Sequence, residues 1–309
     1  MLEAEAIPDG FASPEEAEAD GAPPLVSFFI PAYNEQDAIV QVVQDVIDVM
    51  APLDVAYEII VIDDGSTDET VARCRAIPGV RVVTHGRNRG EGAARTTGVR
   101  VARGRYVITT DADGTYPASA IPEMIEALGE CDMVIGARTR EMGTMRLLRS
   151  FAKEFIRLLA SYMTRTHIPD LNSGLRAMRR EKVLEFLSIL PTTHSWVSTI
   201  TMAFLSTGYD VRWIPIPYYK RIGRSSFHPI ADTYNYLSLV VRAIMYFDPL
   251  RIFLPVTMLL FAAGFGKLVY DAIVYRFHFT PSVIVLILAA FQIGAMGLLA
   301  DLIVRRSRR

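Results

Sequence analysis

Cysteine and the common phosphate-binding loops are scarce or missing in this 309-residue chain. Cys74 and Cys131 are too few for a disulfide framework, and no C-x-x-C pair or Cys/His cluster offers a zinc site, so we expect a reducing compartment. The absence of G-x-x-x-x-G-K-[ST] excludes a P-loop hydrolase. Gly90-x-Gly92 lacks the third glycine of a dinucleotide loop, because Arg95 occupies its place, and it follows a middle strand; this excludes a dehydrogenase.

Basic residues are absent from residues 1–24, which carry seven acids. This segment is rich in Ala, Glu and Pro and has no apolar periodicity, so we expect a disordered acidic tail. It lacks the basic start and apolar run of a signal peptide. Without its −7, the formal net charge of −2 becomes about +5, which argues against a uniformly basic nucleic-acid binder but permits a basic face. No nucleic-acid partner is therefore expected.

Two long apolar runs stand out in a chain that is 51% hydrophobic with a mean hydropathy of +0.25. They are Phe253–Tyr275 and Pro281–Val304, and at about 1.5 Å per residue each reaches roughly 35 Å, enough to cross a hydrocarbon core of about 30 Å. Lys267 and Asp271 lie one helical turn apart in the first run, so their charges can pair. We expect two transmembrane helices within residues 252–304. The alternative is a pair of buried core helices, but no other segment is left in the chain to bury them.

Arginines flank these apolar runs. Arg242 and Arg251 precede the first run, and residues 305–309 form a basic tail with four arginines. The positive-inside rule then places the region before residue 252 and both chain ends in the cytoplasm. The expected location is the plasma membrane of a bacterium or archaeon, or the endoplasmic reticulum, with a multi-pass topology.

Residues 144–163 combine basic and bulky apolar side chains at helical spacing. At 100° per residue the two sets fall on opposite sides of a helix, with Arg146, Arg149, Lys153 and Arg157 on the basic side. Such a helix suits a membrane interface, and the alternative is an ordinary surface helix packed on the domain. Residues 229–251 form a second amphipathic, juxtamembrane stretch.

Short apolar runs alternate with amphipathic stretches from Leu25 to Arg138. The predicted strands are 25–30, 58–62, 80–84, 106–109 and 133–135, and the predicted helices are 37–50, 67–76, 91–102 and 121–128. This order predicts an α/β fold with a mostly parallel sheet covered on both faces. Ligands of such sheets bind at the carboxyl ends of the strands.

Three polar motifs follow predicted strands at that edge. They are Pro31-Ala32-Tyr33-Asn34-Glu35, Asp63-Asp64-Gly65-Ser66-Thr67-Asp68 and Asp111-Ala112-Asp113-Gly114-Thr115. The first, taken alone, suits a plain capped turn. In the second, Ser66 or Thr67 can cap the next helix, and this leaves two adjacent carboxylates able to accept bonds from a base or ribose.

The D-x-D sequence of the third motif predicts a metal site. In an extended i, i+2 arrangement the carboxylates of Asp111 and Asp113 face the same side and repel each other unless a cation lies between them. Mg²⁺ or Mn²⁺ suits such hard oxygen ligands together with substrate phosphates. A solvated acidic loop is the alternative for a lone D-x-D, and three acidic strand ends in one sheet argue against it.

With Gly136-Ala137-Arg138 and residues 170–176 (DLNSGLR), these motifs occur in the order seen in family 2 glycosyltransferases. The chain resembles the branch of dolichyl-phosphate mannose and glucose synthases and their bacterial relatives acting on undecaprenyl phosphate. The resemblance covers about residues 25–228, and the paired C-terminal helices are similar to those of many members. It implies a GT-A catalytic domain over 25–228, a nucleotide-sugar donor of the GDP-mannose or UDP-glucose class, Mg²⁺ or Mn²⁺, and a polyprenyl phosphate acceptor. The resemblance does not fix the oligomeric state, and a homo-oligomer is possible.

The same resemblance implies roles for individual residues. The donor nucleotide is expected to lie among Pro31, Ala32, Tyr33, Glu35 and the Asp111-Ala112-Asp113 motif, with Asp64 near the base and ribose. Asp111 and Asp113 match the metal-binding pair, so Asp113 also counts as catalytic, and Arg138 matches a basic residue near the phosphates.

Residues 220–226 (KRIGRSS) resemble the family's basic loop over the donor, so Arg221 and Arg224 are catalytic candidates. Two departures matter. Thr115 stands where some members have a glutamine ligand, which puts a third protein ligand in doubt. Arg224 stands where lysine or glutamate is frequent, which bears on donor choice.

The implied reaction transfers a hexose, mannose or glucose, to dolichyl or undecaprenyl phosphate with inversion, on the cytoplasmic leaflet. A phosphate monoester with a second pKa of about 6 is largely ionised at neutral pH and needs no general base, so His85, His167, His194 and His228 are assigned surface or packing roles. Cations at the membrane surface are needed instead. Arg146, Arg149 and Lys153 can bind the acceptor phosphate or, alternatively, anionic lipid headgroups.

Three other readings stay open. A processive polysaccharide synthase shares the early motifs but needs more membrane helices and Q-x-x-R-W, of which residues 210–213 (DVRW) are a fragment. A transferase to diacylglycerol or to a protein hydroxyl would need a general base. A non-catalytic, membrane-tethered nucleotide-binding protein would bind nucleotide without donor turnover, and the intact D-x-D argues against it.

Overall fold

The computed structural model describes residues 23–139, 161, 166–193, 195–222, 249–274 and 280–307. Apart from its last two residues the predicted acidic tail lies outside these ranges, as do nearly all of the predicted helices at 144–163 and 229–251. The chain divides into two compact units, one built around a sheet and one around the two C-terminal helices.

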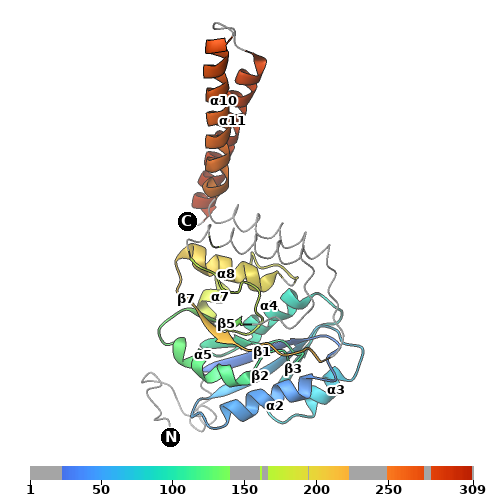
Figure 1. Cartoon of the computed structure of the whole chain (residues 1–309). Helices are drawn as coiled ribbons and strands as arrows, with labels where there is room; N and C mark the ends of the chain where they lie inside the picture. The colour runs from blue at the N-terminus through green and yellow to red at the C-terminus, as the bar shows by residue number, and fades with distance from the viewer. Residues whose placement is uncertain are drawn as a thin grey trace. The chain divides into compact units, whose positions relative to one another are not determined.

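A seven-stranded sheet forms the centre of the first unit among the described residues, in the order β3-β2-β1-β4-β6-β5-β7 (Figure 1). Neighbouring strands are parallel except around β6, which is antiparallel to both β4 and β5. The predicted mostly parallel α/β sheet is therefore confirmed. The strands are β1 (Val26–Ala32), β2 (Tyr57–Asp63), β3 (Val80–Thr84), β4 (Tyr106–Thr109), β5 (Met133–Arg138), β6 (Arg176–Arg179) and β7 (Val211–Ile216).

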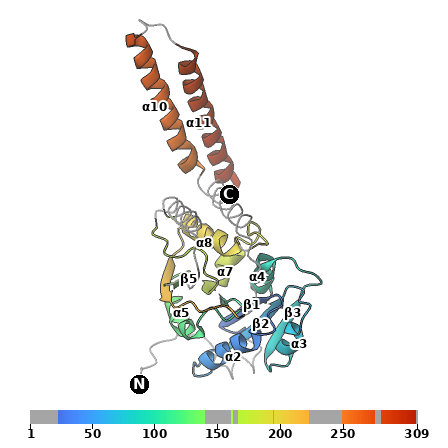
Figure 2. The same ribbon diagram turned by 45° about the vertical axis from the view of Figure 1, so that its right-hand side comes forward.

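Helices cover both faces of this sheet (Figures 1 and 2). One face carries α2, α3, the short η1 and α5; the other carries α4, α7 and α8. The four predicted helices are present as α2 (Ile39–Met50), α3 (Thr70–Arg75), α4 (Glu91–Val101) and α5 (Ile121–Ala127), and each end lies within three residues of the predicted one. The sequence did not predict the short η1 (Ala118–Ala120), α7 (Arg180–Leu184) and α8 (Trp196–Thr207).

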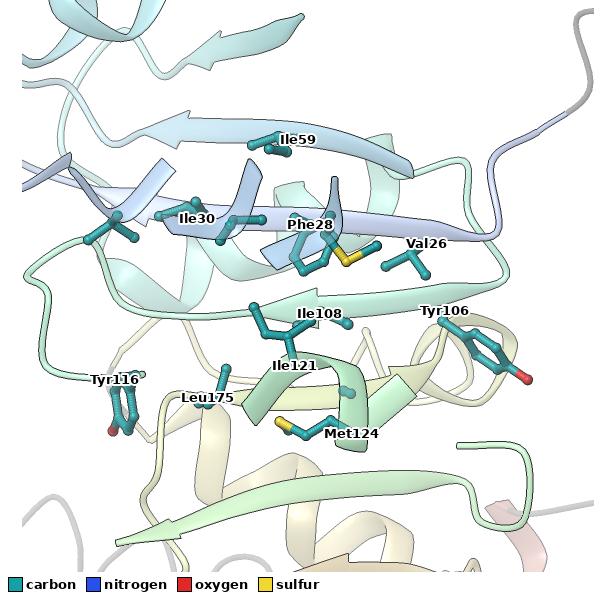
Figure 3. Packing of buried hydrophobic residues seen from close by; sticks show 14 of the residues in the cluster. Val26, Phe28, Ile30, Ile59, Tyr106, Ile108, Tyr116, Ile121, Met124 and Leu175 are labelled. Atoms are coloured by element: carbon teal, nitrogen blue, oxygen red, sulfur yellow. The ribbon is translucent and has the colours of Figure 1, made fainter. Parts of the chain in front are cut away.

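The apolar core lies between the sheet and the α2/α5 layer (Figure 3). Phe28 and Ile30 of β1 are fully buried, Ile108 of β4 pairs beside Phe28, and Ile121 of α5 lies against Ile108. Burying one such side chain contributes about 1.5–3 kcal/mol. On the other face Gly98 of α4 lies against the Phe29 ring, so β1 is covered on both sides; a continuously apolar sequence is what such a strand requires.

Strand β6 has no periodicity that would predict it, because its sequence is RAMR. It nevertheless lies inside the sheet, between β4 and β5, and Arg176 within it is fully buried. Two further arginines follow: Arg179 donates to the carbonyls of Leu128 and Cys131 after α5, and Arg180 donates to Val99 at the end of α4. These arginines satisfy terminal carbonyls on both faces of the sheet, and cations are favourable at helix C-termini.

The second unit contains a hairpin of two long helices, α10 (Leu250–Val274) and α11 (Pro281–Ser307). Both are long and apolar enough to cross a membrane, and most of their large apolar side chains are exposed. The predicted pair of Lys267 and Asp271 is present. Asp271 also accepts bonds from the backbone N–H and the hydroxyl of Thr280, at 3.0 and 2.6 Å, so it joins the end of α10 to the start of α11.

Candidate functional site

The acidic motifs gather at the carboxyl edge of the parallel strands. β1 pairs with β2 on one side and β4 on the other, with Ala32 opposite Asp63 and Phe29 opposite Thr109. The segments after these three strands therefore leave the sheet side by side. This arrangement places the PAYNE, DDGSTD and DADGT motifs along one edge, where ligands of parallel sheets bind.

The first two motifs are joined by reciprocal hydrogen bonds. The backbone N–H of Asn34 donates to Ser66 Oγ at 2.9 Å, and the side-chain Oδ1 of Asn34 accepts from the backbone N–H of Thr67 at 2.8 Å. Asn34 adopts a positive φ of 55°, which asparagine tolerates better than most residues. Pro31 and Ala32 are buried at the strand end, and the Tyr33 side chain beside them is exposed.

The prediction that Ser66 or Thr67 caps the next helix is wrong. Ser66 Oγ is the acceptor for Asn34, and α3 begins later, at Thr70. The Asp68 carboxylate accepts from the Thr70 N–H at 3.0 Å instead. Tertiary pairing between the loops decides the helix start here.

Both adjacent carboxylates of the second motif have partners within the chain. Asp63 accepts from the N–H groups of Gly65 and Ser66. Asp64 accepts from His85 Nδ1 at 2.7 Å and from the N–H groups of Arg89 and Gly90, at 2.9 and 2.7 Å. His85 also contacts Thr97 through Nε2 at 3.0 Å. Asp64 therefore orders the 85–90 loop, and its predicted place near the base and ribose stays a prediction.

Asp111 is held between a buried arginine and a glycine. Arg95 Nη2 lies 2.5 Å from Asp111 Oδ1, and Arg95 is only 1% exposed. Gly174 also lies against this carboxylate: an added Cβ would stand 2.6 Å from Asp111 Oδ2 and nearer still to Oδ1. Only glycine fits this close approach. Arg176 supports the glycine's loop, because it donates to the carbonyls of Leu171 and Ser173 at 2.9 and 2.7 Å.

Asp113 lies against the candidate basic loop. Its Oδ1 accepts from the Thr115 hydroxyl and N–H at 2.6 and 3.1 Å, and its Oδ2 lies 3.5 Å from Arg221 Nε. Arg221 also pairs with the carboxylate of Glu35. The structure thus brings Glu35, Asp113 and Arg221 together from three segments far apart in the sequence.

Residues 219–222 pair with the D-x-D turn through their backbone. The Ile222 N–H donates to the Asp113 carbonyl at 3.1 Å, and the Tyr219 N–H donates to the Thr115 carbonyl at 2.9 Å. Gly114 turns between them with φ of 73°. These two backbone hydrogen bonds hold the segment that carries Arg221 beside Asp113.

Arg138, at the end of β5, is paired with Asp170. Its Nε and Nη2 donate to the two carboxylate oxygens of Asp170 at 2.7 and 2.9 Å. Its guanidinium carbon also lies 5.3 Å from the centre of the Tyr218 ring, which packs edge-on against Tyr116. The Tyr116 hydroxyl accepts from the Gly174 N–H at 2.7 Å. Arg138 is therefore connected to the D-x-D region through two tyrosines.

Crowding of carboxylates perturbs protonation at this edge. Burial raises the pKa of Glu35, with a further upward push from Asp113 and an opposing effect from Arg221. The pKa of Asp111 is raised to about 6, chiefly by burial. The Arg95 charge lowers it only in part, and the charges of Glu91 and Asp113 raise it further. Burial by itself would raise the pKa of Asp170. The hydrogen bonds and the charge of the Arg138 guanidinium outweigh this effect, so the pKa of Asp170 lies below its usual value. Negative charge is in excess around Asp111, and a cation would relieve it.

The donor set fits a hard divalent cation. Asp111 and Asp113 supply carboxylate oxygens, and Asp111 keeps 30% of its side chain exposed. Across the described ranges no group of three or more His, Cys, Asp or Glu side chains is arranged to hold a metal ion. Mg²⁺ in nucleotide sites is held by one or two carboxylates plus substrate phosphates and water, which is the set available here.

Several predicted site residues lie outside the described ranges. Arg146, Arg149 and Lys153 of the predicted interfacial helix are among them, as is Arg224 of the basic loop. Three residues that sequence reasoning did not assign hold the site together: Arg95, Asp170 and Gly174. One signal for Arg95 was available, since it is the single large side chain in the stretch Gly92–Gly98 of α4 and lies four residues after Glu91.

A mixed sheet with these loops at one edge, covered by helices on both faces, defines a GT-A-like domain followed by an apolar helical hairpin. The description "Glycosyl transferase family 2" matches residues 27–187, and "GtrB C-terminal hairpin" matches residues 248–305. The chain belongs to glycosyl transferase family 2.

Two curated relatives align over much of their own length. The dolichyl-phosphate hexose transferase of Haloferax volcanii is 33% identical over 202 residues, which are 64% of this chain and 85% of the relative. The dodecaprenyl-phosphate galacturonate synthase of Rhizobium johnstonii is 24% identical over 301 residues, 91% of this chain and 88% of the relative. The chain spans about half the length of other curated relatives that it matches.

Among solved structures, glucosyl-3-phosphoglycerate synthase from Mycobacterium tuberculosis, in complex with Mn²⁺, UDP and glucosyl-3-phosphoglycerate, superposes with a TM-score of 0.55. The match covers 77% of this chain and 86% of that one at 22% sequence identity. At this level the likeness shows a shared fold.

Proposed function

We propose that this chain transfers a hexose from a nucleotide-diphosphate sugar to a polyprenyl phosphate, releasing the nucleoside diphosphate. The observation that carries the proposal is the meeting of Asp111 and Asp113 with Glu35 and Arg221 at the ligand edge of the sheet, in a chain that also carries an apolar hairpin. Two relatives that align over most of their length are named for sugar transfer to polyprenyl phosphates. A structural neighbour was crystallised with Mn²⁺ and UDP.

Donor binding is assigned to the PAYNE and D-x-D segments. Pro31 and Ala32 form the buried floor, and the exposed Tyr33 ring is available to lie against the base or ribose. Asp111 and Asp113 would hold Mg²⁺ or Mn²⁺, which neutralises charge on a bound diphosphate. Arg221, tied to the turn at Asp113, supplies a fixed positive charge beside the departing phosphates; such preorganised charge is commonly the largest contribution to catalysis. Arg138 and Arg224 complete the proposed cationic set.

The acceptor needs no proton removed at neutral pH, because a phosphate monoester is already largely ionised there. Consistent with this, His85 is engaged by Asp64 and Thr97, and it is assigned no catalytic role. Attack on the anomeric carbon from the face opposite the leaving group gives a β-linked product from an α-linked donor. Arg146, Arg149 and Lys153 are the proposed acceptor-phosphate cations, and the two apolar helices are proposed to span the membrane with the sheet on its cytoplasmic side.

The test is transfer by the purified full-length protein in detergent. The protein is incubated with undecaprenyl or dolichyl phosphate, a panel of labelled GDP- and UDP-sugars, and Mg²⁺ or Mn²⁺. One lipid-linked sugar of a single size is expected, with loss of product after EDTA and recovery on adding back the metal. A ladder of products would indicate a processive synthase, and product formed on diacylglycerol without lipid phosphate would overturn the acceptor assignment. NMR of the product then gives the anomeric configuration.

A further inference from the structure

Arg95 is a buried cation directly behind the D-x-D motif. Its Nη1 donates to Thr109 Oγ1 at 2.7 Å, its Nε donates to Glu91 Oε1 at 3.0 Å, and its Nη2 is shared between Glu91 and Asp111 at 2.6 and 2.5 Å. Anchors on both α4 and β4 therefore hold the planar guanidinium. Because Arg95 is 1% exposed and each of its three guanidinium nitrogens donates a hydrogen bond, its charge is held beside Asp111.

This arrangement divides the two oxygens of Asp111 between different tasks. The hydrogen bond and ion pair that Asp111 makes among the described residues are both to Oδ1, from Arg95. Gly174 lies against the same carboxylate, since an added Cβ there would overlap it, and so leaves the side chain no room to move toward the 170–175 loop. Oδ2 is consequently the oxygen that remains for a cation, and its direction is set by Arg95 and Gly174 together.

The charges around this point fall into two chains among the described residues. Arg95 lies between Glu91 and Asp111, and Arg221 lies between Glu35 and Asp113. Four carboxylates thus face two guanidinium groups. A fixed positive charge so close to a metal-binding carboxylate opposes a second cation there, whereas the negative charge of a diphosphate would offset that opposition.

We propose that Arg95 is a positioning residue that makes divalent-cation binding at Asp111 and Asp113 depend on the donor diphosphate. Its charge keeps the carboxylate pair weak for a free cation, and its fork holds Asp111 in the orientation that a cation–diphosphate pair requires. The inference rests on the proposed function, in that it takes a nucleoside diphosphate as the ligand. Arginine and lysine differ here, because a single ammonium cannot bridge Glu91, Thr109 and Asp111 in this geometry.

The experiment measures Mn²⁺ binding by the full-length protein in detergent at pH 8. Free Mn²⁺ is followed by its electron paramagnetic resonance signal, alone and with UDP or GDP in separate titrations. Wild type is expected to bind Mn²⁺ weakly alone and more tightly with the effective nucleotide. Arg95→Gln is expected to bind Mn²⁺ alone about ten-fold more tightly, the size of effect that removing one nearby like charge produces. The enhancement by nucleotide shrinks accordingly.

Three further variants separate charge from geometry. Arg95→Lys keeps the charge, so its binding of Mn²⁺ alone stays weak while the nucleotide enhancement falls. Glu91→Gln removes an anion from the same chain and is expected to weaken binding of Mn²⁺ alone, the opposite sign to Arg95→Gln. Arg100→Gln makes the same charge change at an exposed position of α4 and is expected to leave both values unchanged.

Opposite shifts in two neighbouring variants cannot come from a general loss of folding, and the unfolding temperature of each variant is recorded as a check. Unchanged or weaker binding of Mn²⁺ alone by Arg95→Gln, with full nucleotide enhancement, would overturn the proposal. If Arg95→Gln does not fold, the Glu91→Gln variant decides: an affinity for Mn²⁺ alone equal to that of wild type would overturn the proposal. The readout involves no sugar transfer, so failure of every donor in the transfer assay, with the expected Mn²⁺ shifts present, would count against the proposed function alone.

Discussion

At the scale of single residues, the site depends on close approaches and on charges that are shared between segments. Asp113 illustrates this, because one carboxylate oxygen is taken by Thr115 and the other faces Arg221. The same side chain shapes the turn and carries the charge that a cation needs. Replacing it should therefore affect chemistry much more than folding.

Asp113→Ala is expected to reduce transfer about a thousand-fold, at the upper end of what removing one preorganised electrostatic group costs. The measurement is initial rate with saturating metal and donor, and the unfolding temperature is expected to stay close to wild type. Asp54→Ala, at an exposed aspartate before β2, is the matched control and should transfer normally. Turnover of Asp113→Ala near the wild-type rate would remove Asp113 from the metal pair.

Gly174→Ala tests the close approach to Asp111. The added methyl would overlap the carboxylate, which Arg95 prevents from moving away, so we expect transfer to fall by about a hundred-fold. Gly86→Ala is the control, because an added Cβ there meets nothing within 4 Å. Equal activity of both variants would show that Asp111 has room to shift.

At the scale of secondary-structure elements, periodicity and motif order were sufficient for the first half of the sheet. The runs that became β1, β2, β4 and β5 are apolar and largely buried, β3 is a half-exposed edge strand, and amphipathic spacing marks α2 between β1 and β2. Strand β6 could not be predicted in this way, because RAMR is buried by virtue of its position between β4 and β5 rather than by its own composition. The predicted start of α3 was wrong for a similar reason, since Ser66 and Thr67 form hydrogen bonds with Asn34 in the loop after β1.

The candidate site was predictable to the extent that its residues follow strands. Asp111, Asp113 and Glu35 were found from the strand-end pattern and the family resemblance. Arg95 and Gly174 were not assigned, because their importance comes from contacts between α4, β4 and the 170–175 loop, and the spacing of Arg95 after Glu91 is only a weak local signal. Sequence reasoning thus identified the ligand-facing residues and missed those that hold them in place.

The pair between Arg138 of β5 and Asp170 makes a prediction about pH. Folding lowers the pKa of Asp170 below its usual range, so the pair stabilises the fold at neutral pH, and this contribution is lost as pH falls through the lowered folded-state pKa. Asp170→Asn is expected to lower the free energy of unfolding by about 3 kcal/mol at pH 7, the cost of removing one partner of a buried ion pair.

Urea unfolding at several pH values is the measurement for this pair. The difference between wild type and Asp170→Asn should shrink as the pH is lowered past the ordinary aspartate range and the wild-type carboxylate becomes protonated at its lowered pKa. Asp54→Asn, at an exposed position, should track wild type throughout. A gap that stayed constant over this range would show that Asp170 acts through shape rather than charge.

At the scale of the whole molecule, the two units pose a question of topology that the native cysteines make easy to answer. Cys74 and Cys131 are buried, and burial raises the pKa of the Cys74 thiol to about 11. Both should react slowly with maleimides in the folded protein, because the thiolate is the reactive form. Single new cysteines can therefore be read against a low background.

We expect His278→Cys, between α10 and α11, to react with a membrane-impermeant maleimide added outside intact cells or sealed vesicles of native orientation. Ser307→Cys, at the end of α11, should react only after permeabilisation. This follows from the arginines near Arg251 and Arg305 if the hairpin spans the membrane. Labelling of both positions from outside would contradict a spanning hairpin, and the reverse pattern would invert the orientation.

The place of β6 has a consequence for how the protein is made. β5 reaches the rest of the sheet only through β6, yet β6 is translated some forty residues after β5 begins. A nascent chain can assemble β1 to β4 early, but β4 keeps an open edge until Arg176–Arg179 leaves the ribosome and slots in from the opposite direction. That insertion also brings Gly174 to Asp111, whereas β7 and Arg221 can join the sheet and the candidate site only afterwards.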